Sequence, residues 1–190
     1  WSSKWMAMKG AEVVAFDAME HPTIGLGAGA VFLKNHDIYF DRVCGDFNKL
    51  PFQDGTFDIV VSTGSMHHSN NLSETISESV RVLKAGGCLA IMNEPVGRFR
   101  AKDETVKLKG DQEGINEHEY RMTRYLSLFR CHKLRIGEIR ESPLVYERGS
   151  AYYRGVLASL INRTLWGRLL SLVMWGGVMN ILVYKSGPKT

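Results

Sequence analysis

The first residue whose side chain could take part in binding or catalysis is Asp17, a carboxylate at the end of a predicted buried strand. Residues 10–16 form a short run rich in β-branched side chains, and Asp17 closes it. In nucleotide-binding α/β folds, a carboxylate at this position accepts hydrogen bonds from the two ribose hydroxyls. A helix N-cap is the alternative interpretation. The ribose role requires a glycine-rich turn about 20 residues upstream, and counting back places that turn before Trp1.

Two adjacent histidines, His67 and His68, follow another apolar run at residues 57–62. A neutral histidine can take a proton near pH 7, so either side chain could act as a general base. A purely structural pair is the alternative. Side chains of neighbouring residues diverge, and no third ligand stands at a suitable spacing. We therefore expect no metal at this pair.

Strands alternating with helices would position these residues. We expect strands at residues 10–16, 38–44, 57–62, 88–92, 133–141 and 178–184, and helices at residues 1–9, 72–83, 117–131 and 156–175. Asn71 is predicted to cap the second of these helices, and Gly86 to stop it. Residues 97–114 are charged and are expected to form a loop or lid. Such alternation predicts an α/β fold with a parallel sheet.

The most specific pattern of the chain lies between Asp46 and Gly87. It comprises Asp46-Phe47-Asn48-Lys49-Leu50-Pro51-Phe52, Asp54-Gly55-Thr56-Phe57-Asp58 and Arg81-Val82-Leu83-Lys84-Ala85-Gly86-Gly87. In order and spacing these stretches resemble motifs of class I S-adenosylmethionine-dependent methyltransferases, in the branch that acts on small molecules. The resemblance implies a doubly wound, Rossmann-like, mostly parallel sheet with an antiparallel last strand at residues 178–184. It also implies S-adenosylmethionine as the cofactor.

The same resemblance assigns residues to the cofactor. It implies that Asp17 binds the ribose, that Asp46 or its neighbouring amide meets the adenine edge, and that Phe47 borders the adenine ring. Ser65 and Met66 would line the pocket around the transferred methyl group. Because the carboxyl ends of strands line one crevice in a doubly wound sheet, we expect these residues at the same edge.

Other residues would face the methyl acceptor. Residues 115–120 resemble a stretch found in some sugar and natural-product methyltransferases, which brings His118 and Tyr120 toward the acceptor. A capped helix start with exposed polar residues is the alternative there. Glu94 ends a predicted strand at the crevice, and we expect it to bind the acceptor together with Tyr120 and His68. The resemblance makes His67 and His118 the candidate catalytic bases.

One part of the family pattern is not found in residues 1–190. Gly25, Gly27 and Gly29 follow Asp17 instead of preceding it, so we interpret them as a loop or a helical turn. The first family strand and its glycine-rich loop are therefore expected to be missing, and this chain to bind the cofactor poorly. We expect one domain over 1–190, with a cofactor half at 1–95 and a substrate half at 96–190. A methyltransferase-like binding or scaffold protein without cofactor activity is the alternative.

Charge is divided unevenly along the 190 residues. Residues 1–95 carry 7 Lys and Arg against 11 Asp and Glu, whereas residues 96–190 carry 17 against 9. An acidic half suits a cationic cofactor and a basic half suits an anionic acceptor. Together with the resemblance, which implies methyl transfer, this predicts O-methylation of a small polar or anionic metabolite, such as a sugar or a natural-product-like acceptor. The basic residues are scattered, which argues against nucleic acid.

Composition also bears on the location of the protein. Three well-separated cysteines and the lack of a secretory signal in residues 1–10 favour a reducing, cytoplasmic setting. Residues 165–183 carry a single charge, and by length they could cross a bilayer. Two central glycines and a strand-like second half favour a buried helix followed by a strand, so we expect no membrane partner. The oligomeric state is open, and a homo-oligomer is compatible with the sequence.

Overall fold

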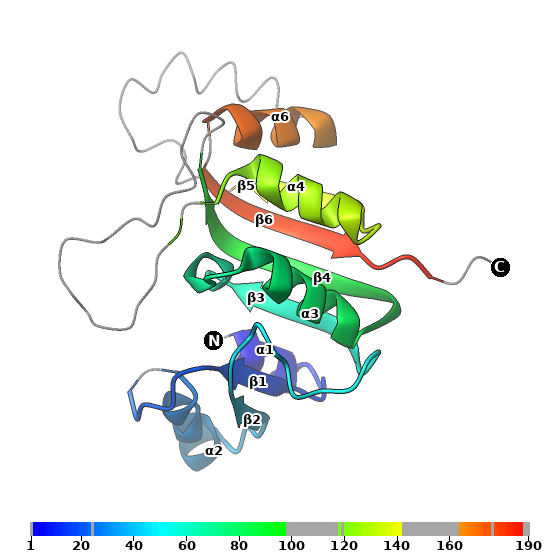
Figure 1. Ribbon diagram of the computed structural model, residues 1–190. Helices are drawn as coiled ribbons and strands as arrows, with labels where there is room; N and C mark the ends of the chain where they lie inside the picture. Colours follow the sequence, from blue (N-terminus) through cyan, green and yellow to red (C-terminus); the bar gives the residue numbers. More distant parts are fainter. Residues whose placement is uncertain are drawn as a thin grey trace, which may run out of the picture. The chain divides into compact units, whose positions relative to one another are not determined.

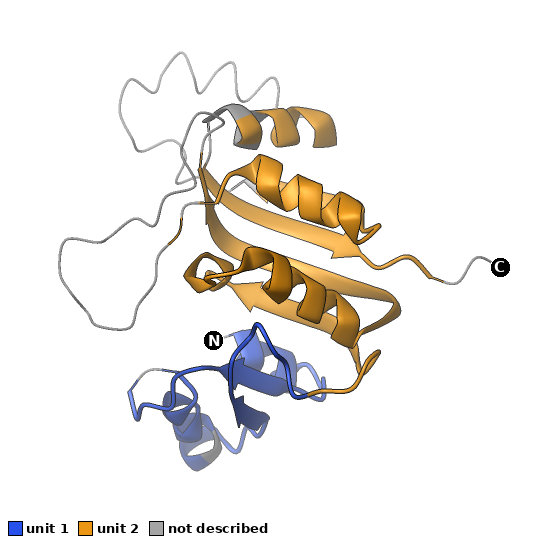
Figure 2. Cartoon of the chain, viewed as in Figure 1, with its two compact units in different colours: residues 1–51 blue, residues 52–190 orange. Residues whose placement is uncertain are grey.

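The computed structural model describes residues 2–23, 25–97, 118, 120–141, 164–175 and 177–187. The chain divides into two compact units, residues 1–51 and residues 52–190 (Figure 2). This boundary lies earlier than residue 95, where the sequence placed the change from a cofactor half to a substrate half. The expectation of one domain over residues 1–190 stays a prediction.

The first unit contains a two-stranded parallel sheet. Its elements are α1 (Ser2–Met8), β1 (Val14–Asp17), the 3-10 helix η1 (Gly27–Gly29), α2 (Ala30–His36) and β2 (Asp41–Cys44). β1 and β2 pair along their whole length, and Asp17 stands opposite Cys44. The stretch from Gly25 to Gly29 is a turn leading into α2, as predicted. At Gly25 the backbone has a φ of +62°, and a Cβ would collide with the Met19 carbonyl, so only glycine fits.

The second unit contains a four-stranded mixed sheet. Its elements are β3 (Phe57–Thr63), the 3-10 helix η2 (Met66–His68), α3 (Leu72–Val82), β4 (Leu83–Val96), α4 (Met122–Cys131), β5 (Arg135–Glu141), α6 (Leu165–Trp175) and β6 (Gly177–Tyr184). The strand order is β3-β4-β6-β5. β3 is parallel to β4, and β6 is antiparallel to both β4 and β5 (Figure 1). The predicted α/β fold with an antiparallel last strand is confirmed.

The core of the second unit lies between the sheet and its helices. Figure 1 shows α3 and α4 on the same face of the sheet. Both helices direct apolar residues of helical spacing inward, such as Ile76 on α3 and Phe129 on α4, and both side chains are buried. β6 contributes alternate residues, of which Ile181 is buried, as expected for a strand covered on this face.

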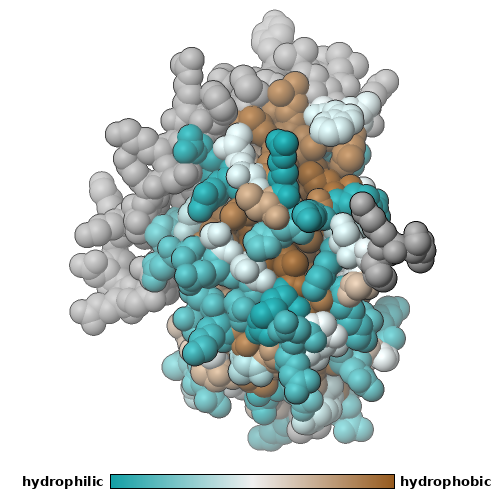
Figure 3. Space-filling model, turned by 45° about the vertical axis from the view of Figure 1, so that its right-hand side comes forward, coloured by the Kyte–Doolittle hydropathy of each residue, from teal (hydrophilic) through white to brown (hydrophobic). Residues whose placement is uncertain are grey.

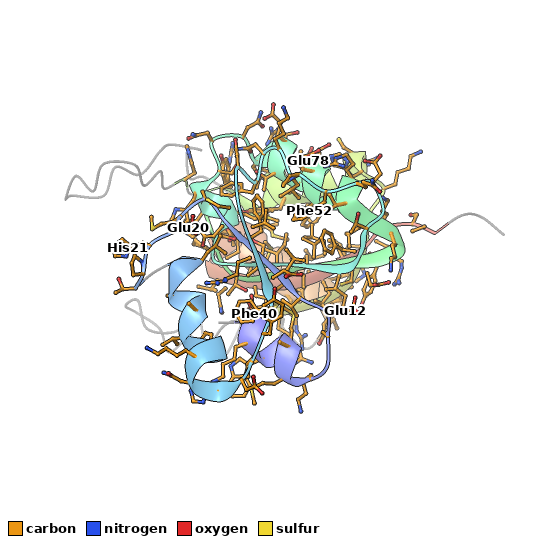
Figure 4. The ribbon with its side chains drawn as sticks, turned by 90° about the horizontal axis from the view of Figure 1, so that it is seen from below. Glu12, Glu20, His21, Phe40, Phe52 and Glu78 are labelled. Atoms are coloured by element: carbon orange, nitrogen blue, oxygen red, sulfur yellow. The ribbon has the colours of Figure 1, made fainter. Side chains whose placement is uncertain are left out.

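Charged residues of the Asp46–Gly87 motif tie the entrance of β3 to the end of α3. Arg81 donates to the Phe52 carbonyl at 2.7 Å and to Asp54 at 2.7 Å. It also binds Glu78 on its own helix, and Glu78 and Phe52 both lie in the upper part of Figure 4. Lys84 pairs with Asp58 at 2.8 Å. The acidic and basic members of the motif are thus partners across space.

Two helix boundaries differ from the prediction. α3 ends at Val82, because Leu83 is already extended and begins β4, so the φ of +81° at Gly86 falls within the segment of β4 instead of stopping the helix. α4 begins at Met122 instead of residue 117. The cause is that Tyr120 accepts a hydrogen bond from the Gly97 amide, at 3.0 Å, which holds this part of the chain beside the end of β4. The expected lid at 98–114 and the expected helical residues 156–163 lie outside the described residues.

The predicted N-cap of α3 is confirmed, and it can be tested by substitution. The Asn71 side chain accepts a hydrogen bond from the Glu74 amide at 3.4 Å. Replacing Asn71 by Ala leaves this amide without its cap, so we expect the free energy of unfolding to fall by about 1 kcal/mol. Urea denaturation measures the change. Asn71→Asp retains an acceptor and should stay close to wild type; equal losses in both variants would contradict the cap.

The apolar segment near the C-terminus forms a short helix and a strand, as predicted. α6 ends at Trp175 and β6 starts at Gly177. Within the described part of the chain, no helix has the length and apolar character needed to cross a membrane. α6 nevertheless presents exposed apolar side chains, Trp166 at 77% and Leu170 at 53% exposure. Apolar surface also gathers in the upper part of Figure 3, next to the grey residues.

Candidate active site

In the first unit, two carboxylates lie at the carboxyl edge of the sheet. Asp17 is the last residue of β1, and Asp46 follows β2, which runs parallel to it. The Asp17 side chain is exposed, and its Oδ1 accepts a hydrogen bond from the Met19 amide at 2.9 Å. Figure 4 shows Glu20 and His21, in the loop after β1, pointing away from the strands. The exposed Asp17 side chain precedes this loop in sequence.

Asp46 organises its own turn. Its Oδ1 accepts hydrogen bonds from the Asn48 amide at 2.8 Å and from the Asn48 side chain at 3.0 Å. This arrangement is an Asx turn, in which an aspartate side chain replaces a backbone acceptor. Phe47 is half-buried between these two residues. The adenine roles of Asp46 and Phe47 stay predictions.

In the second unit, a tight turn connects β3 to η2. Gly64 has a φ of +54°, and its amide donates to the Met92 carbonyl at 2.8 Å. Ser65 is half-buried, with its hydroxyl 2.8 Å from that of Ser62. Met66 is 2% exposed. The turn brings residues 65–68 to the carboxyl end of β3, where the sequence placed them.

A β-bulge near the end of β4 positions Glu94. The register with β6 shifts between Ile91 and Glu94, and Asn93 has a φ of +53°. The Asn93 amide leaves the ladder and donates instead to the Asn180 side chain at 2.9 Å. A bulge adds one residue to a strand and re-aims the next side chain. Glu94 is 0% exposed as a result, in the interior instead of at the crevice.

The Glu94 carboxylate is surrounded by protein groups. It accepts hydrogen bonds from the Met66 amide at 3.2 Å and from the Tyr125 hydroxyl at 3.0 Å. Nδ1 of His67 lies 3.3 Å from Glu94 Oε1, within ion-pair distance. This contact is not a hydrogen bond, and the buried nitrogen has no hydrogen-bond partner among the described residues. Burial, and secondly the charge of Glu94, raise the pKa of Tyr125 well above its usual value.

Residues 118–120 join this cluster from a distant part of the sequence. The His118 amide donates to the His67 carbonyl at 2.9 Å, and its ring lies 3.3 Å from the Asn70 side chain. The His118 ring also stacks on Tyr120, with centroids 5.3 Å apart. Tyr120 donates to the Ser69 carbonyl at 2.6 Å. The two candidate bases therefore belong to adjoining segments.

The second unit thus assembles most of the residues that the sequence selected. They are Ser65, Met66, His67, His68, Glu94, His118 and Tyr120. Asp17, Asp46 and Phe47 belong to the first unit. The sequence analysis did not select Tyr125. The feature that could have indicated it is a single hydroxyl on the otherwise apolar face of α4. Within the described residues, no three His, Cys, Asp or Glu side chains are grouped as metal ligands.

The residues present suit a nucleotide-type cofactor. Asp17 is an exposed acceptor at a strand end, with one oxygen engaged locally, and the carboxyl edge of a parallel sheet is where α/β folds bind such ligands. A parallel sheet with acidic residues at this edge is typical of nucleotide-binding α/β domains. Residues 1–91 match the protein family described as "Methyltransferase domain".

Individual relatives agree with the family match. Over 83 residues the chain is 37% identical to the protein YafE of Escherichia coli, covering 43% of this chain and 38% of YafE. Over 90 residues it is 37% identical to a demethylmenaquinone methyltransferase of Streptomyces avermitilis, covering 47% of this chain and 36% of that enzyme. The chain therefore spans well under half the length of these curated relatives.

Solved structures show the same fold. An S-adenosylmethionine-dependent methyltransferase from Mesorhizobium loti superimposes with a TM-score of 0.63 at 14% identity, covering 97% of this chain and 85% of that one. Residues 1–91 thus resemble a methyltransferase domain, and the fold is the one found in class I S-adenosylmethionine-dependent methyltransferases. S-adenosylmethionine is the cofactor of this class, as the sequence predicted.

Proposed function

We propose that the protein transfers a methyl group from S-adenosylmethionine to a hydroxyl of a small polar or anionic metabolite. The observation that carries the proposal concerns His67, a half-buried histidine at the carboxyl end of β3. It lies beside the buried carboxylate of Glu94. A general base at this position contributes to catalysis only if the acceptor must be deprotonated during methyl transfer. Amine or carbon acceptors need such a base less than a hydroxyl does.

The cofactor, when bound, supplies a methyl group on a sulfonium, which is a good leaving group. Asp17 would hold the ribose, and Asp46 with Phe47 would border the adenine. His67 would take the proton of the acceptor hydroxyl, and Tyr120 and His118 would orient the acceptor. Holding the reacting atoms in near-attack geometry supplies a large part of the rate acceleration, and general base catalysis adds about 10²–10⁴-fold.

The acceptor class is inferred from charge. Residues 96–190 carry 17 basic against 9 acidic residues, which favours a polar or anionic acceptor. Related proteins carry names that range from demethylmenaquinone to 27-O-demethylrifamycin SV methyltransferase, so family membership leaves the acceptor open. We place the reaction in the cytoplasm, a setting that suits the free thiols Cys44, Cys88 and Cys131.

Two measurements on the full-length protein test this function. Calorimetric titration with S-adenosylmethionine measures cofactor binding, and transfer of a radiolabelled methyl group measures activity on a panel of sugars, hydroxy acids and amines. We expect saturable binding and labelled product from hydroxylated, preferably anionic, acceptors. Absence of cofactor binding would support a methyltransferase-like scaffold protein instead. Labelling of amines alone would overturn O-methylation.

A further inference from the structure

We propose that Glu94 is a positioning residue that keeps the proton of neutral His67 on Nδ1, which leaves Nε2 as the atom that accepts a proton. The sequence assigned Glu94 to acceptor binding, but its carboxylate is fully buried and contacts protein groups. The catalytic consequence of this inference rests on the proposed function. The placement of the proton does not, and it can be measured separately.

Two donors face the Glu94 carboxylate. The Met66 amide reaches Oε2, and the Tyr125 hydroxyl reaches Oε1, so each oxygen has one donor. Tyr125 is itself kept protonated by burial and by the neighbouring charge. It can therefore act as a donor throughout the neutral pH range.

The position of His67 then determines where its proton lies. Nδ1 is buried and lies 3.3 Å from Glu94 Oε1, and it has no hydrogen-bond partner among the described residues. If Nδ1 carried no proton, its lone pair would face a carboxylate oxygen in a poorly solvated site, which is unfavourable. A proton on Nδ1 converts this contact into an attraction. The His67 side chain is 13% exposed, whereas its Nδ1 atom is buried.

The charged and titratable groups around His67 come from η2, β4 and α4, and from the segment of His118, whose amide donates to the His67 carbonyl. His68 lies next to it on η2, with ring centroids 4.0 Å apart. Glu94 comes from β4, and Tyr125 approaches the same carboxylate from α4. A neutral imidazole that donates through one nitrogen accepts through the other. Glu94 is the one acceptor described at Nδ1, so it selects the tautomer with a free Nε2.

The first test reads the proton directly. Long-range ¹H–¹⁵N NMR spectra of the full-length protein distinguish the two tautomers of a histidine by the ¹⁵N shifts of Nδ1 and Nε2. We expect the neutral form of His67 to carry its proton on Nδ1, with assignment by comparison with His67→Gln. A proton on Nε2 in the wild-type protein would overturn the proposal, whether or not the protein methylates anything.

The second test changes the carboxylate. Glu94→Gln preserves the size of the side chain, but its amide can donate to Nδ1 and so move the proton to Nε2. We expect this tautomer change in the spectrum. We also expect turnover to fall by at least about 10²-fold with cofactor affinity retained, since replacing an orienting carboxylate by its amide in a serine protease costs about 10⁴-fold. Glu94→Gln with the wild-type tautomer would contradict the proposal.

A matched control separates positioning from stability. Glu78→Gln makes the same chemical change at a partly buried glutamate on α3, where the partner is Arg81. It should leave the His67 tautomer and turnover unchanged. Should Glu94→Gln not fold, Tyr125→Phe removes one donor to Oε1 while Glu94 still faces Nδ1. In that variant we expect the proton to stay on Nδ1; its transfer to Nε2 would count against Glu94 as the residue that fixes it.

A change of tautomer without any change in turnover would mean that Glu94 positions His67 but that His67 is not the base. That outcome would reject the catalytic role and keep the positioning role. An unchanged tautomer together with lost activity would reject the positioning role of Glu94 and leave His67 as a candidate base. The two measurements therefore distinguish a failure of this inference from a failure of the proposed function.

Discussion

Replacing His67 by Ala is expected to lower turnover by about 10²–10⁴-fold, the usual contribution of a general base, while affinity for S-adenosylmethionine is retained. The reason is that acceptor deprotonation is lost, whereas the residues assigned to the cofactor are untouched. Single-turnover kinetics with labelled cofactor measure the effect.

His118→Ala is the matched comparison. Its ring is held by Asn70 and Tyr120 and has no described carboxylate partner, so we expect a smaller loss that includes weaker acceptor binding. A larger loss in His118→Ala than in His67→Ala would make His118 the base. Unchanged turnover in both variants would mean that the acceptor is already nucleophilic and that catalysis rests on proximity.

The second large effect is expected at Asp17. If its carboxylate binds both ribose hydroxyls, Asp17→Ala gives up two charge-assisted hydrogen bonds of roughly 1.5 kcal/mol or more each, so the Kd for S-adenosylmethionine should rise by about 10²-fold or more. Asp46→Ala should have a smaller effect, because a backbone amide can still hold the adenine edge. Calorimetry on the full-length protein compares the two.

The two variants are well matched. Asp17 caps the Met19 amide, and Asp46 accepts from the Asn48 amide and side chain, so each substitution removes local turn contacts in addition to any ligand contact. Asp17→Asn preserves the turn acceptor but removes the charge, and it should still weaken binding. A wild-type Kd for Asp17→Ala would remove Asp17 from the cofactor site.

Much of the fold could be predicted because local patterns agree with it. The strands that gave clear apolar runs, such as Phe57–Thr63 and Gly177–Tyr184, lie where the sequence put them. The spacing of the Asp46–Gly87 motif has a physical basis in the pairing of Arg81 with Asp54 and of Lys84 with Asp58. The start of α4 could not be predicted, because it depends on a contact of Tyr120 with Gly97, which lies far away in sequence.

In the candidate site, too, some features could be predicted from the sequence and others could not. Strand ends that carry Asp17 or Ser65 follow from strand periodicity, since the carboxyl end of a parallel strand is recognisable in a sequence. The burial of Glu94 does not, because it depends on a bulge at Asn93 that is completed by Asn180, 87 residues later. Tyr125 was missed for a related reason: helical periodicity assigned it to the core but could not show that its hydroxyl would meet a carboxylate there.

The place of β6 in the sheet has a consequence for synthesis of the chain. β6 is the last strand in sequence, yet it lies between β4 and β5 and pairs with both. During synthesis, the edges of β4 and β5 that pair with β6 therefore stay unpaired until residues 177–184 have left the ribosome. The Asn93–Asn180 contact can form only then. Non-local pairing of this kind slows folding and exposes strand edges to aggregation. A chain terminated before residue 177 can still pair β3 with β4, but it can form neither the β4–β6 and β5–β6 pairs nor the bulge that buries Glu94.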